Sequence, residues 1–134
     1  MDEARIRRDY HALSSEYHAV LSDSLTRLYI HDFPYPTGWK PRPAPFLIRY
    51  PDAYPRVQPA IYIPEHLTYT NGAVTHTLKS DLDGWQRWCT HHVPWNPGDY
   101  ELPQFLDIIW HSLNEPASNN PIEYVSDDTA ASHV

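Results

Sequence analysis

The chain is poor in the features that mark several large classes of protein. A single cysteine among 134 residues cannot form an internal disulfide, so the fold does not depend on an oxidising compartment. Basic residues are also scarce, because 10 Lys and Arg against 17 Asp and Glu give a net charge of −7. That charge argues against nucleic acid as a partner. No apolar run approaches the about 20 residues of a membrane span, and the charged start MDEARIRR does not resemble a signal peptide. We therefore expect a cytoplasmic protein that binds neither nucleic acid nor membrane.

What the chain does contain fits one globular domain. Apolar residues make up 41% of it, and five Trp, ten Tyr and three Phe can fill a core. Fourteen prolines punctuate mainly the middle of the chain. We expect one domain over residues 1–121, followed by a polar, acidic and flexible tail over residues 122–134.

Two stretches have helical periodicity. The first runs from residue 5 to 17, where apolar residues recur at gaps of four, three and four: Ile6, Tyr10, Leu13 and Tyr17. Arg5, Arg7 and Arg8 lie off that stripe, so we expect them on the solvated face of the helix. The second stretch repeats the same gaps at Leu102, Leu106, Ile109 and Leu113. Pro103 suits its first turn and Pro116 its end.

Short segments rich in strand-forming residues lie between the two helices. Residues 25–30, 46–50 and 61–63 predict three strands, and residues 74–78 predict a weaker fourth. The proline-rich stretch DFPYPTGWKPRPAP predicts turn or loop. Short strands joined by short loops indicate an antiparallel meander of three to four strands. The fold class is therefore α+β, with helix covering one face of the sheet.

Two stretches resemble the ubiquitin-conjugating enzymes, the UBC-like superfamily. The run LTRLYIHDF…PAPFLIRYPDAYPRVQPAIYI is similar to the sheet of that family and its Tyr-Pro loop. The matching positions are Phe46, Ile48, Tyr50, Pro51, Tyr54, Pro55 and Pro59. In the second stretch Cys89 stands at the place of the active-site cysteine, followed by Trp95-Asn96-Pro97, the second helix, Pro116 and Pro121. The run GWQRWCTHHVPWNPGD resembles the prokaryotic branch of the superfamily.

The resemblance implies a function for Cys89. In this family the cysteine accepts a ubiquitin-like modifier as a thioester from an activating enzyme and transfers it to a target amine, in some cases with a ligase. The attacking species is the thiolate, and a few per cent of an ordinary thiol is ionised at neutral pH. ATP is consumed by the activating enzyme, so the resemblance implies no cofactor and no metal here.

The sequence departs from the family pattern at three places. The nearest match to the His-Pro-Asn motif is His76-Thr77-Leu78, where Leu replaces the Asn, and Asn71 is a distant substitute. The acid before the second proline is Asn120 here. The chain also lacks the sequence for the two further C-terminal helices of typical members. These departures put the groups that speed transfer to lysine in doubt, while the thioester-forming residue is retained.

Several neighbouring residues are candidates for helping Cys89. An imidazole of His91 or His92 near the sulfur could lower the thiol pKa or relay a proton; the alternative is that both are loop histidines bonded to backbone. His76 would brace the loop by hydrogen bonds. Trp85, Trp88 and Trp95 are expected to pack in the core and loops, with their N–H groups bonded to carbonyls.

Residues of the first helix carry the partner prediction. By resemblance, Arg5, Arg7 and Arg8 would dock on an acidic surface of the activating enzyme. A solvated helix face explains the same three residues.

Three alternatives stay open. The chain could be an inactive module of the same fold that binds a ubiquitin-like protein or its activating enzyme. Cys89, His76, His91 and His92 could hold a metal, although Cys-x-His-His is not a usual ligand spacing. Cys–His hydrolysis by a deconjugating protease is the third, and no Asn or Asp suited to orient the histidine is evident.

Overall fold

Two helices, one large sheet and one two-stranded ribbon are present in the computed structural model, which describes residues 2–72, 74, 77–90, 93–98 and 101–116. The elements in chain order are α1 (Glu3–Ser14), β1 (Ala19–Leu21), β2 (Arg27–Phe33), β3 (Trp39–Lys40), β4 (Ala44–Arg49), β5 (Ala60–Pro64), β6 (Thr68–Tyr69), β7 (Thr77–Leu78), β8 (Trp85–Trp88) and α2 (Leu102–Leu113). Neither helix of this described part has the length and apolarity that a membrane crossing requires.

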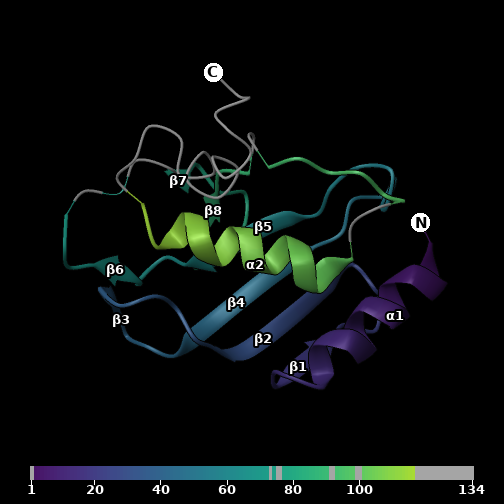
Figure 1. The fold of residues 1–134 in the computed structure, drawn as a ribbon, viewed down its shortest axis with the longest axis horizontal. Helices are drawn as coiled ribbons and strands as arrows, with labels where there is room; N and C mark the ends of the chain where they lie inside the picture. The colour runs from purple at the N-terminus through teal and green to yellow at the C-terminus, as the bar shows by residue number, and fades with distance from the viewer. Residues whose placement is uncertain (1, 73, 75–76, 91–92, 99–100, 117–134) are drawn as a thin grey trace.

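The large sheet has six strands in the order β1-β2-β4-β5-β8-β7, and every neighbouring pair is antiparallel. Strands β3 and β6 pair separately as a ribbon. Helix α2 lies across one face of the sheet, α1 lies beside β1, and the ribbon lies at the opposite end of the molecule from α1 (Figure 1). The α+β prediction is confirmed, whereas the expected count of three to four strands is wrong.

The strands that the sequence did not predict have physical explanations. Strand β1 has only three residues, too few to show a period. Strand β8 consists of Trp-Gln-Arg-Trp, in which Trp88 is buried and Arg87 is exposed, and four residues are too few to distinguish a strand from an irregular stretch. In the proline-rich stretch, β3 occupies the two residues between Gly38 and Pro41. Tertiary pairing, and not local propensity, makes these short segments strands.

Helix α1 begins at a capped end and buries a different stripe from the predicted one. The side chain of Asp2 accepts a hydrogen bond from the backbone N–H of Arg5 at 3.0 Å. Ile6 and Leu13 are buried as expected, and Asp9 is buried between them on the same helical face. Tyr10 is only half-buried, and the helix ends at Ser14, before Tyr17.

Helix α2 spans its predicted core residues and is tied to the sheet side by indole N–H groups. Its stripe of Leu102, Leu106, Ile109 and Leu113 is buried, which confirms the periodicity. The N–H of Trp39 donates to the Leu113 carbonyl at 2.9 Å, and that of Trp110 donates to the Pro34 carbonyl at 2.7 Å. These bonds fix both the position of α2 and the ribbon-side loops.

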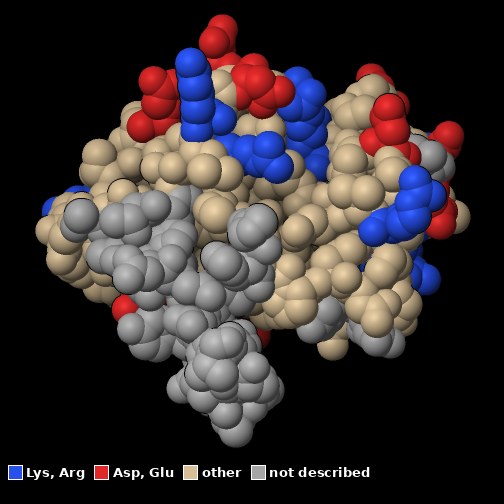
Figure 2. Space-filling view, turned by 90° about the horizontal axis from the view of Figure 1, so that it is seen from above, with Lys and Arg blue, Asp and Glu red and all other residues tan. Residues whose placement is uncertain are grey.

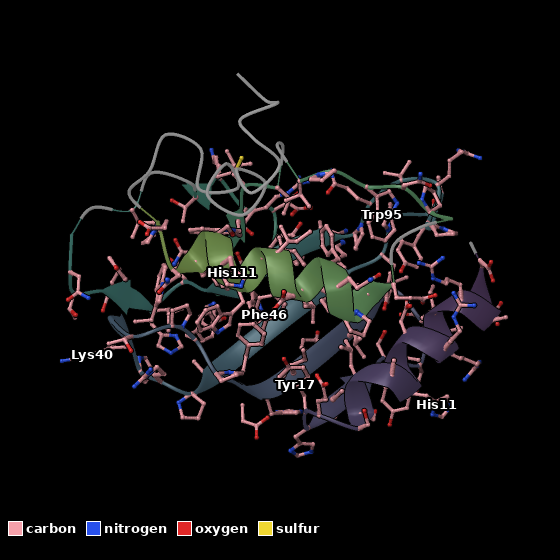
Figure 3. The ribbon with its side chains drawn as sticks, viewed as in Figure 1. His11, Tyr17, Lys40, Phe46, Trp95 and His111 are labelled. Carbon is pink, nitrogen blue, oxygen red and sulfur yellow. The ribbon has the colours of Figure 1, made fainter. Side chains whose placement is uncertain are left out.

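The core lies between α2 and the sheet. Along β4, Phe46 and Ile48 point to this side, and the ring of Phe46 stacks on Phe33 with centroids 4.1 Å apart. Figure 3 shows Phe46 between the sheet and α2. Within the described part of the chain, neither helix covers the opposite face of the sheet, which carries Arg49 of the same strand.

Candidate active site

Cys89 is the first residue after β8, and its side chain is partly exposed. Its two chain neighbours are both buried, with Trp88 fully enclosed and Thr90 8% exposed. The buried neighbours therefore hold the segment in place, while Cys89 itself reaches the surface.

Trp88 anchors the chain on the N-terminal side of Cys89. It pairs with Ile61 of β5 on one side and Thr77 of β7 on the other. Its indole N–H donates to the Ser112 hydroxyl at 2.9 Å, and that hydroxyl donates to the Ile109 carbonyl at 2.7 Å. The end of β8 is thus bonded both to the sheet and to α2, which restricts where Cys89 can move.

Trp95 anchors the chain on the C-terminal side of Cys89. Its indole N–H donates to the Pro55 carbonyl at 2.6 Å, as expected for a loop tryptophan. Its ring meets Phe105 of α2 edge-on with centroids 5.2 Å apart, and it lies 5.8 Å from the ring of Tyr54. Figure 3 shows Trp95 near the start of α2. The Tyr-Pro loop after β4 therefore supports the stretch that follows Cys89.

A buried polar cluster joins α1 to the same stretch. The Arg5 guanidinium donates to the Pro97 carbonyl at 3.1 Å and to the Asp9 carboxylate at 3.4 Å. The hydroxyls of Tyr54 and Tyr50 donate to the other carboxylate oxygen at 2.5 and 3.4 Å. Burial raises the pKa of Asp9, while the Tyr54 hydrogen bond and the Arg5 charge oppose that rise. Desolvation also raises the pKa values of Tyr50 and Tyr54.

The cluster overturns the prediction for one residue of the basic trio. Arg5 was expected on the solvated face as a partner-binding residue, but its side chain is 8% exposed and paired with Asp9. It holds α1 against the loop and offers no charge to a partner. Arg8 is exposed and pairs with Glu101 at 3.2 Å, and Arg7 is exposed with no side-chain bond among the described residues.

The remaining predicted positions divide into two groups. His76, His91, His92 and Asn120 lie outside the described residues. Asn71 is described, and its amide lies close to Gly38, next to the β3–β6 ribbon. Of the tryptophans, Trp85 is only partly buried, with its ring 6.4 Å from that of Tyr29.

The geometry suits acyl-group chemistry at sulfur. A thiol that is partly exposed on an anchored segment can ionise and attack an activated carbonyl delivered from outside. Among the described residues, no cluster of three or more His, Cys, Asp or Glu side chains is placed to hold a metal ion. The histidines of the metal alternative lie outside that part of the chain, so this alternative is not tested.

An N-terminal helix, an antiparallel sheet crossed by a later helix and a partly exposed cysteine at the end of a strand define the class as UBC-like. The family model Prokaryotic E2 family E matches residues 6–116, and the chain belongs to that family. The match includes both anchoring tryptophans and Cys89, and it confirms the resemblance found in the sequence. No curated protein and no solved structure matches the chain significantly.

Sequence reasoning missed the polar residues that brace the site. Asp9 lies three residues after Ile6 and four before Leu13, a spacing that places it on the buried face of α1. Arg5 precedes it by four residues, the spacing of a helical ion pair. These two spacings together were the available signal. Ser112 gave no such signal, because its role depends on the approach of Trp88 from a distant strand.

Proposed function

We propose that Cys89 carries a ubiquitin-like modifier between an activating enzyme and a target amine. In the first step the Cys89 thiolate attacks the thioester carbonyl that joins the modifier to the activating enzyme. A new carbon–sulfur bond forms, and the thiolate of the activating enzyme leaves. In the second step a target amine attacks the same carbonyl, an amide forms, the Cys89 thiolate leaves and the amine loses its proton to solvent or a nearby base.

The observation that carries the proposal is the placement of Cys89 within the matched family segment. The family match spans residues 6–116, and the only cysteine of the chain stands inside it at the end of β8. Its side chain is partly exposed although both neighbours are buried. A carrier needs this combination, because the donor is another protein that must reach the sulfur, and the sulfur must be held in a fixed position when it does.

Partner proteins supply the rest of the reaction. Activation of the modifier consumes ATP on the activating enzyme, so this chain needs no nucleotide of its own. Transfer between two thioesters is close to isoenergetic, because the bond that forms is of the same kind as the bond that breaks. We infer that Cys89 needs correct positioning more than a strong internal base for the loading step.

The test is a loading reaction with a cognate activating enzyme, its modifier and ATP, resolved on a non-reducing gel. Wild-type protein is expected to gain a band of modifier-linked mass that disappears on addition of thiol. Cys89→Ala removes the band. Cys89→Ser provides a chemical control, because its hydroxyl forms an oxyester that withstands thiol. A band of the same mass in Cys89→Ala removes Cys89 from the mechanism.

The same experiment separates the carrier from an inactive module. A module would bind the modifier or the activating enzyme with equal affinity in wild type and Cys89→Ala and would form no thioester. A pull-down run beside the gel measures that binding. Binding without any thiol-sensitive band would replace the carrier proposal by the module.

A further inference from the structure

The face of the sheet away from α2 holds a groove of about 610 Å³ that the proposed chemistry does not use. Its walls come from β2, β4, β5 and β8 and from the loops beside them. Four of its lining residues are cations, Arg27, Arg49, Lys79 and Arg87, and two are acids, Asp52 and Asp81. Figure 2 shows Lys and Arg interleaved with Asp and Glu along the margin of the molecule away from α2.

The concentration of positive charge in the groove is out of proportion to the chain. Four of its 10 basic residues line this one surface, although the chain as a whole carries a net charge of −7. The four cations and two acids leave the groove positive. A local positive surface on an acidic protein attracts negatively charged ligands and repels positively charged ones.

The arrangement of the arginines destabilises the sheet when no ligand is bound to the groove. Arg27 of β2 and Arg49 of β4 are direct cross-strand partners, and like charges placed opposite each other destabilise a sheet. Asp81 offsets only one of them, since its carboxylate accepts from Arg49 at 2.8 Å. Arg27 has a 3.4 Å contact with the Tyr29 hydroxyl. Such a local conflict is expected where a surface serves a ligand.

Two of the cations have no side-chain partner in the described part of the chain. Lys79 and Arg87 are exposed, and neither makes a side-chain hydrogen bond or ion pair there. Arg87 lies across from Tyr62, whose hydroxyl donates to Asp81 at 3.0 Å. The donors of Lys79 and Arg87 therefore remain available to an incoming carboxylate.

The groove also offers an acceptor and an apolar contact. The Gln58 side-chain oxygen is buried and has no hydrogen-bond partner among the described residues, and Val57 beside it is 47% exposed. An inorganic phosphate brings acceptors for the cations but little to donate to Gln58. A peptide brings carboxylates, backbone N–H donors and apolar side chains together.

We propose that this groove binds an extended acidic segment of a partner protein. Carboxylates of the segment pair with Lys79, Arg87 and Arg27, a backbone N–H donates to Gln58, and an apolar side chain covers Val57. The inference does not rest on the thioester chemistry, because the side chains that would contact the segment are neither Cys89 nor the tryptophans and polar cluster that hold Cys89 in place.

Fluorescence anisotropy with a synthetic probe tests the proposal. The probe is a fluorescein-labelled ten-residue peptide of glutamate and glycine with one central leucine, and its control has every glutamate replaced by glutamine. Wild-type protein is expected to bind the acidic probe, to bind it more weakly as salt rises, and not to bind the glutamine control. Lys79→Glu/Arg87→Glu is expected to weaken binding by about tenfold, since one exposed ion pair contributes up to about fivefold.

A matched double variant controls for net charge. Lys40→Glu/Arg56→Glu makes the same change at two exposed cations outside the groove and is expected to keep wild-type affinity. Equal weakening by both double variants would reduce the effect to overall charge and overturn the proposal. Absence of binding to wild type, equal binding of the glutamine control, or complete displacement of the probe by stoichiometric tripolyphosphate would overturn it as well. Cys89→Ala is expected to bind the probe as wild type does, so failure here is distinguishable from failure of the carrier function.

Discussion

Asp9 shows how a single residue can join parts of the molecule that are far apart in sequence. Its carboxylate is 1% exposed and receives bonds from Arg5 on its own helix and from Tyr50 and Tyr54 beyond β4. Arg5 in turn bonds the carbonyl of Pro97. The N-terminal helix, the Tyr-Pro loop and the stretch after the cysteine are therefore held by one polar cluster.

We expect Asp9→Asn to destabilise the protein by about 1–3 kcal/mol, because Asn offers one acceptor oxygen where the carboxylate offers two, and its NH2 group would face the donors of either Arg5 or the two tyrosines. The effect depends on pH. Burial raises the pKa of Asp9 in the folded state above its ordinary value of 3.8, so the folded state holds the proton more tightly than the unfolded state. The stability that this proton contributes is complete below the unfolded pKa and is lost as pH rises through the folded pKa. Urea unfolding from neutral pH down to about pH 4 should show that the free energy of unfolding of wild type increases relative to that of Asp9→Asn as pH falls. A difference that shrinks on acidification would contradict the raised pKa.

Ser112 is the second residue with a measurable contribution. We expect Ser112→Ala to cost about 1–3 kcal/mol in unfolding free energy, because the buried indole N–H of Trp88 loses its acceptor. In a cycle with Trp88→Phe, the double variant should cost less than the sum of the two single variants. Strict additivity would mean that the 2.9 Å bond between them contributes nothing.

At the scale of elements, the β3–β6 ribbon depends on one glycine. Gly38 has a φ of +107°, and a Cβ there would lie 2.7 Å from both the Asn71 amide nitrogen and the Tyr69 ring. Gly38→Ala is expected to destabilise the protein by about 1–3 kcal/mol through backbone strain and this close approach. Gly98→Ala is the matched control, since a Cβ there meets only an Asn96 oxygen at an ordinary 3.7 Å. Urea unfolding of the two variants compares them directly, and equal losses would refute the role of the Gly38 geometry.

The elements that could be predicted from sequence are those whose own pattern decides them. Helix α2 satisfies a 3.6-residue period over three turns, so the amino-acid pattern alone identifies its core residues correctly. Strand β8 lacks such a pattern, because it has four residues and its partners β5 and β7 are contributed by other parts of the chain. The prediction for Arg5 failed for a similar reason, as only the fold brings Tyr54 and Pro97 to the face of α1 that carries it.

The chemistry of the candidate site could be predicted from sequence, but the contacts that hold the site in place could not. Cys89 could be chosen because it is the only thiol and precedes the Trp95-Asn96-Pro97 motif. The bonds of Trp88 to Ser112 and of Trp95 to Pro55 join residues 24 and 40 positions apart, and no local pattern encodes them. The predicted roles of His76, His91 and His92 stay predictions.

At the scale of the whole molecule, the distribution of charge decides which surfaces can steer a partner. Arg7 is the exposed cation of the α1 trio that has no side-chain bond among the described residues, and it stands on an acidic protein. If α1 docks on an acidic activating enzyme, Arg7→Glu should slow thioester loading several-fold at low salt, with the difference fading as ionic strength rises. Loading rates from quenched time courses measure this effect. Lys40→Glu, which makes the same charge change at the far end of the molecule (Figure 3), should load at the wild-type rate. Equal slowing by both variants would remove α1 as the steering surface.

The tryptophans that bond α2 give the molecule a built-in optical reporter. Trp39 and Trp88 donate to acceptors on the helix, and Trp110 donates from the helix to Pro34. Separation of α2 from the sheet would expose the buried indoles of Trp39 and Trp88 to water at the same moment and shift their emission to longer wavelength. Unfolding, and any loosening of the helix on arrival of a partner, can therefore be followed by native fluorescence on unlabelled protein.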